Sequence, residues 1–131
     1  FALPETGIGI IPAAGATQRM VNIIGLGLAT DMILTGRRLD SEEALAAGLI
    51  TYRVAPEELL PTAHKVAERI QRKGPIAIQL AREVLRHGHK SDHATGMLLE
   101  RLAQSILYAT EDKHEGTTAF TEKRNPEFNG R

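Results

Sequence analysis

The chain has 131 residues, which is enough for one modest domain with a core of its own. Hydrophobic residues make up 42% of it but aromatic residues only 4%, which favours packed helices with aliphatic side chains between them. Sixteen basic residues balance sixteen acidic ones, so the charge lends no support to a nucleic-acid or membrane partner, and the absence of cysteine excludes disulfides and thiolate chemistry.

The first twelve residues are predicted to form a short strand and a loop. Phe1–Leu3 is an apolar segment that ends at Pro4, and the β-branched residues Ile8, Ile10 and Ile11 stand between glycines. This stretch is too rich in proline and glycine for a signal peptide. No apolar run approaches the roughly 20 residues of a membrane span, so we expect no membrane partner.

Two helices are expected next, separated by a glycine. Met20 and Ile23 begin a helical apolar pattern that Gly25 interrupts. A second helix is predicted over Leu26–Leu34, with Gly36 in the position after its end.

A short capped helix and a strand complete the first part of the chain. Asp40 followed three residues later by Glu43 is typical of a capping box, and Gly48 would end that helix. The β-branched and aromatic residues of 49–56 predict a strand that stops at Pro56.

The rest of the chain is predicted to be a bundle of short antiparallel helices. Pro75 suits the first position of one of them, and the last is expected to bury Ala119 and Phe120. The predicted helices are Glu57–Arg72, Ile76–His87, Ser91–Ala109 and Glu111–Lys123.

The sequence gives little support for a nucleotide site, a metal site or a serine nucleophile. The segments "GIGIIP" and "GLGLAT" lack the third glycine of a dinucleotide fingerprint, and neither contains a phosphate-loop lysine. His87, His89 and His93 are close in sequence, but Gly88 breaks the helix between them, so we expect no metal site. No G-x-S-x-G elbow is present for a serine nucleophile.

Glu5 is the carboxylate with the strongest functional prospect. It stands between the apolar residues Leu3 and Ile8, which would partly remove it from water and suit it to proton transfer. The alternative is an exposed acid in a turn after Pro4.

Three long blocks of the sequence resemble the crotonase (enoyl-CoA hydratase/isomerase) superfamily. They are "FALPETGIGIIPAAGATQR", "LTGRRLDSEEALAAGLI" and "EGTTAFTEKRNPEF", in the family's order and over essentially the whole chain. The resemblance implies an α/β crotonase-like fold (the ClpP/crotonase spiral), with this chain as its C-terminal half, mainly helical with two or three short strands. Residues 1–56 would be the end of the core, and residues 57–131 a helical oligomerisation and lid region.

The resemblance also implies a set of site residues. Glu5 matches the second of two glutamates that hydratases use, and would act as general acid and base. The Ala13 N–H would point at the attacking water, although Ala13 and Ala16 stand where the family has glycine. Lys123 would approach the nucleotide of coenzyme A, often from a neighbouring subunit, and Phe120 would help to pack the helix before it. The implied substrate-binding residues are Phe1, Pro4, Ala13, Gly15, Phe120 and Lys123.

The function implied is that of an enoyl-CoA hydratase in fatty-acid β-oxidation. No metal and no cofactor other than the coenzyme A thioester substrate are expected, and a homotrimer or hexamer in the cytoplasm or the mitochondrial matrix would fit. In the family the oxyanion hole and the first glutamate precede Phe1, so we expect the chain to be inactive alone. Isomerase or another acyl-CoA activity remains an alternative, as does a non-catalytic helical oligomerisation module.

Overall fold

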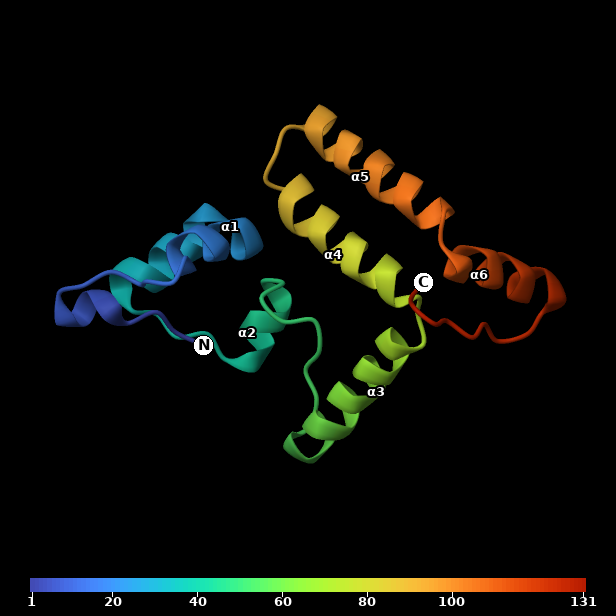
Figure 1. The fold of residues 1–131 in the computed structure, drawn as a ribbon. Coiled ribbons are helices and arrows are strands. Elements are labelled where there is room, and N and C mark those ends of the chain that lie inside the picture. The colour runs from blue at the N-terminus through green and yellow to red at the C-terminus, as the bar shows by residue number, and fades with distance from the viewer. The chain divides into compact units, whose positions relative to one another are not determined.

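A computed structural model describes residues 1–131 and contains only helical elements (Figure 1). They fall into two compact units, Phe1–Glu58 and Leu59–Arg131. None of the helices combines the length and the apolar character that crossing a membrane requires. In chain order the elements are η1 (Glu5–Ile8), α1 (Ala16–Thr35), α2 (Ser41–Ala46), η2 (Pro56–Glu58), α3 (Leu59–Gln71), α4 (Pro75–Gly88), α5 (His93–Tyr108) and α6 (Glu111–Glu122).

The chain contains no β-strand, so the predicted α/β class with two or three short strands is wrong for it. A strand needs a ladder of hydrogen bonds to a neighbouring strand. Phe1 and Leu39 do exchange both N–H···O bonds, each 2.8 Å long, but this pair stands alone. In the second predicted strand, the N–H groups of Leu49 and Ile50 instead return to the carbonyl of Ala44.

The helix boundaries of the first unit follow the predicted local signals. Gly25 has φ 79° and ψ 160°, a break that divides α1 where the sequence places the end of one helix. Gly36 ends α1 in the left-handed region with φ 74°. The capping box is confirmed: Asp40 accepts from the N–H groups of Glu42 and Glu43 at 2.8 Å, and the Glu43 carboxylate accepts from the Asp40 N–H.

In the second unit, α4 and α5 form an antiparallel hairpin (Figure 1). Pro75 lies at the start of α4, as predicted. The two helices approach closely at Gly88 and Gly96, since a Cβ on Gly96 would lie 3.3 Å from the Gly88 carbonyl oxygen. Glycine therefore sets the spacing of the hairpin near its turn.

The remaining packing is more open than the predicted bundle. No residue of α3, α4 or α5 is fully buried. Ala119 is buried, but Phe120 is 86% exposed, so its predicted burial is wrong. Phe120 is exposed because successive side chains of an α-helix point about 100° apart, so that Ala119 faces the interior of the unit and Phe120 does not.

The last residues of the chain return to the start of α6 and α4. Asp112, in the first turn of α6, accepts from the N–H groups of Asn129 (2.7 Å) and Gly130 (2.9 Å), and its own N–H donates to the Arg131 carbonyl at 3.0 Å. Gly130 also lies against Pro75. We call these contacts of Asp112 with residues 129–131 the C-terminal clasp.

A second carboxylate holds the turn that follows α6. Glu115 accepts two hydrogen bonds from the Arg124 guanidinium, at 2.5 and 2.8 Å, and a third from the Glu127 N–H at 2.8 Å. These donors stabilise the ionised carboxylate, first Arg124 and then the Glu127 amide, and lower the pKa of Glu115 from 4.5 to about 2.

Acid is therefore expected to weaken the second unit through Glu115. Because the folded-state pKa lies below the unfolded value, the stabilisation is complete above about pH 4.5 and is lost as the pH falls toward 2. Urea unfolding midpoints measured from pH 6 to pH 2.5 should fall more steeply for the natural sequence than for Glu115→Gln. Parallel curves for the two proteins would contradict this role of Glu115.

Candidate active site

Glu5 opens the short helix η1, which is fixed at both ends. Pro4 precedes it with φ −88°, and Gly9 ends it in the left-handed region with φ 81°. The Thr6 hydroxyl donates to the Ile33 carbonyl at 2.7 Å and so ties η1 to α1, beside which it lies in Figure 1. The backbone that carries Glu5 is thus held by its neighbours.

The Glu5 side chain is half-buried, and its Oε2 atom is buried without any hydrogen-bond partner in the chain. A buried polar atom without a partner costs free energy, and native proteins keep few of them. Such an atom is therefore a reasonable candidate for contact with a substrate or a bound water.

The loop after η1 accommodates the two alanines that replace family glycines. Ala14 (φ 54°) and Gly15 (φ 78°) adopt left-handed backbone conformations, whereas neither Ala13 nor Ala16 has a positive φ. The loop is closed by hydrogen bonds from Ala16 N–H to the Ala13 carbonyl (3.1 Å) and from Arg19 N–H to the Gly15 carbonyl (2.9 Å). The Ala13 N–H takes no part in these bonds, and its role toward water stays a prediction.

The predicted site residues divide between the two units. Phe1, Pro4, Glu5, Ala13 and Gly15 belong to the first unit, where the Phe1 side chain is 57% exposed and Pro4 is also exposed. Phe120 and Lys123 belong to the second unit, where both lie at the C-terminal end of α6.

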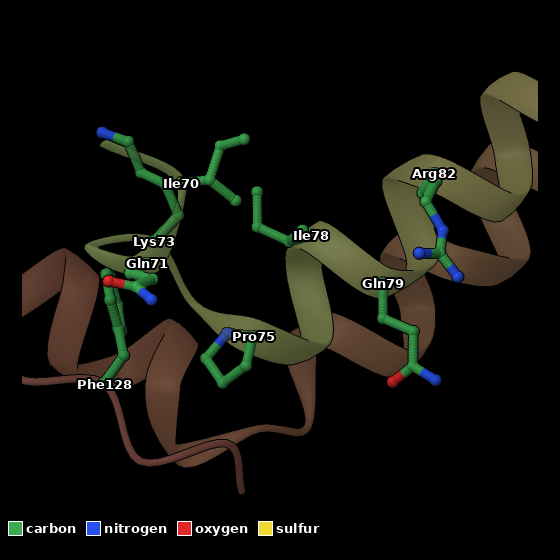
Figure 2. Close-up of a pocket in the computed structure, with 8 residues that line it drawn as sticks. All are labelled: Ile70, Gln71, Lys73, Pro75, Ile78, Gln79, Arg82 and Phe128. Atoms are coloured by element: carbon green, nitrogen blue, oxygen red, sulfur yellow. The ribbon is translucent and has the colours of Figure 1, made fainter. Parts of the chain in front are cut away.

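One hollow of the second unit lies between the end of α3, the start of α4 and Phe128. It measures about 540 Å³, and Figure 2 shows Ile70 of α3 and Ile78 of α4 pointing toward each other beside it. None of the predicted site residues lines it. A second, more apolar hollow of about 520 Å³ in the same unit includes Phe120 and Phe128 in its wall.

The histidines considered as metal ligands do not come together. His87 lies 3.3 Å from the Glu83 carboxylate one turn earlier on α4. No group of three or more histidine, aspartate or glutamate side chains is arranged around a common point.

The whole chain is similar to a family of known enzymes. The family description "Enoyl-CoA hydratase/isomerase" matches residues 1–131. The 2,3-dehydroadipyl-CoA hydratase of Escherichia coli is 41% identical over 131 residues, which are 100% of this chain and 51% of that protein. The crotonyl-CoA hydratase of Syntrophomonas wolfei is 40% identical over 128 residues, 98% of this chain and 49% of that protein.

A solved structure is similar to nearly the whole chain. The enoyl-CoA hydratase from Bacillus anthracis superimposes with a TM-score of 0.95 at 41% identity, over 98% of this chain and 50% of that one. The chain spans about half the length of the curated relatives it matches. The match extends over every residue of the sequence, and the chain belongs to the enoyl-CoA hydratase/isomerase family.

Proposed function

We propose that the protein to which this sequence belongs is an enoyl-CoA hydratase, which adds water across the double bond of a 2-enoyl-CoA. The observation that carries the proposal is Glu5, a carboxylate with one buried oxygen that has no partner in the chain. Relatives at about 40% identity named as hydratases support the same reaction.

In this proposal Glu5 is the proton-transfer group. The oxygen of water forms a bond to the β-carbon and gives up one proton to a carboxylate, while the electrons of the double bond pass to the thioester and form an enolate. The α-carbon then receives a proton, so that one proton is taken up and one is delivered. Glu5 donates the proton to the α-carbon or holds the attacking water. Backbone N–H donors that the resemblance assigns to the segment before Phe1 would stabilise the enolate oxygen.

The other site residues would hold the two ends of the substrate. Phe1 and Pro4 would border the acyl group, and the loop of Ala13 and Gly15 would face the water. Lys123, directly after α6, would approach the phosphates of coenzyme A, often from a neighbouring subunit, because an ammonium group suits phosphate oxygens. Phe120 of α6 would be a further substrate-binding residue.

The test is a product assay with the full-length protein. Incubation with a 2-enoyl-CoA should yield the 3-hydroxyacyl-CoA, seen as loss of the ultraviolet absorbance of the conjugated thioester. Incubation with a 3-enoyl-CoA identifies the alternative, because an isomerase would yield the 2-enoyl-CoA without hydrating it. Absence of both products would contradict the proposal. The 131-residue chain assayed alone is expected to show no turnover.

A helical oligomerisation module is the second candidate, favoured by the apolar side chains that the second unit leaves exposed. They include Leu60, Leu102, Ile106 and Phe120. Surface of this kind is usually covered by a partner. We propose that it contributes to a homotrimer or hexamer, which light scattering of the full-length protein would reveal. A defined oligomer that neither binds nor converts any acyl-CoA would favour the module over the enzyme.

A further inference from the structure

Lys123 occupies a backbone position that usually belongs to glycine. The Arg124 N–H donates to the Ala119 carbonyl at 3.0 Å, and the Lys123 N–H donates to the Phe120 carbonyl at 3.3 Å. This pair of bonds is a Schellman motif, whose penultimate residue adopts the left-handed conformation. Lys123 does so with φ 56°, and residues other than glycine seldom adopt this left-handed backbone conformation. Something must therefore hold the turn in place.

Glu115 supplies that restraint from the preceding turns of α6. Its side chain is 24% exposed, and its carboxylate accepts two hydrogen bonds from the guanidinium of Arg124. Arg124 is the residue directly after Lys123. The same carboxylate accepts from the Glu127 N–H, three residues farther along. The Nε of Arg124 donates to Glu122, the residue directly before Lys123, at 2.7 Å. The chain is thus fixed on both sides of Lys123.

These contacts determine where the Lys123 side chain can reach. If the turn relaxed to the helical or extended region, the Cα–Cβ bond of Lys123 would rotate and its ammonium group would move by several ångströms. A lysine that binds phosphate acts as a point charge, so its contribution depends on that position.

We propose that Glu115 is a positioning residue for coenzyme A: by holding Arg124 it keeps Lys123 in the left-handed turn from which the ammonium reaches the phosphates of the nucleotide. The inference rests on the proposed function, which assigns the nucleotide to Lys123. It adds a residue that touches no substrate atom and acts through the backbone.

The test compares two substrates that differ only in the nucleotide. For the full-length Glu115→Gln protein, KM for a four-carbon 2-enoyl-CoA should rise about twofold to fivefold, the upper part of the range expected when a single exposed ionic contact is displaced. KM for the same acyl group on pantetheine, which lacks the nucleotide, should stay unchanged, as should kcat for both. The matched control is Glu83→Gln, which removes a half-buried carboxylate of α4 paired with Arg82 and His87; it should change neither KM.

Two further variants keep the test decisive if Glu115→Gln folds poorly. Arg124→Lys retains the positive charge but cannot make both hydrogen bonds to the Glu115 carboxylate. It should therefore also raise KM for the coenzyme A substrate and leave KM for the pantetheine substrate unchanged. Lys123→Gly suits the left-handed turn, so it should leave the unfolding midpoint unlowered while raising that KM about tenfold.

The outcomes separate the inference from the proposed function. If Lys123→Gly raises KM but neither Glu115→Gln nor Arg124→Lys does, or if these two raise KM equally for both substrates, the positioning role is wrong and the function stands. If Lys123→Gly has no effect on KM, the assignment of the nucleotide to Lys123 is wrong, and the inference fails with it. If the natural protein converts neither substrate, the proposed function itself fails.

Discussion

Replacement of Glu5 by glutamine is expected to lower kcat for hydration of a 2-enoyl-CoA by at least about 100-fold in the full-length protein. Glutamine has nearly the same size and can still accept and donate hydrogen bonds, but it cannot release or take up a proton at neutral pH. The loss should therefore appear in kcat, with a small change in KM. Steady-state kinetics on one enoyl-CoA substrate measure both constants.

The same replacement should leave stability almost unchanged. The Glu5 Oε2 atom has no partner in the chain, so no internal hydrogen bond of that atom is lost. The anchor of η1 to α1 belongs to Thr6, which the substitution does not touch. Equal thermal unfolding midpoints for the two proteins would show that the lost activity comes from chemistry and not from misfolding.

The chain offers a closely matched control in Glu57. Like Glu5 it follows a proline and lies in a short 3₁₀ helix, η2, but it is exposed. Glu57→Gln should retain the natural kcat. Near-natural turnover of the Glu5→Gln protein, or an equal loss in both variants, would remove Glu5 from the catalytic role.

Features set by a few neighbouring residues could be predicted from the sequence. The capping box of Asp40 and Glu43, the break at Gly25 and the start of α4 at Pro75 all depend on backbone preferences and short-range hydrogen bonds. These effects act within one or two turns of the chain, so the residues involved can be identified without a tertiary structure.

Features that need a distant partner could not be predicted in this way. The β-branched residues near the start suit a strand, but propensity supplies no partner, and only Phe1 and Leu39 pair. Burial of Phe120 failed for a related reason, because helical periodicity does not say how wide a stripe α6 buries.

The candidate site shows the same division. Glu5 could be selected because proline, glycine and apolar residues flank it in the sequence. Glu115 could not, because it meets Arg124 nine residues later through a reversal of the chain, a separation that no helical period links. Asp112 lies in the first turn of α6, a common place for an acid, and no sequence pattern indicates its contacts with residues 129–131.

Replacement of Asp112 by asparagine is expected to destabilise the second unit by about 2–3 kcal/mol, because hydrogen bonds to a charged group are each worth about 1.5–3 kcal/mol. Asp112 is 7% exposed, and each of its carboxylate oxygens accepts from a different backbone N–H in the C-terminal clasp. Asparagine has one oxygen only, so its NH₂ group would face the N–H of Asn129 or Gly130. Urea unfolding of the full-length protein measures the loss, provided that the second unit unfolds with the whole.

Hydrogen exchange at the C-terminal clasp measures the same loss locally, whether or not the second unit unfolds together with the rest of the protein. The amides of Asn129 and Gly130 should exchange at least about 30-fold faster in Asp112→Asn, the factor that corresponds to about 2 kcal/mol. The control is Glu111→Gln, one residue earlier, where a carboxylate 74% exposed pairs with Arg131 at 3.1 Å. An exposed pair of this kind contributes little, so the control should stay within about 0.5 kcal/mol of the natural protein. If both variants exchange alike, the buried carboxylate does not hold the end of the chain, and the contact of Gly130 with Pro75 must hold it instead.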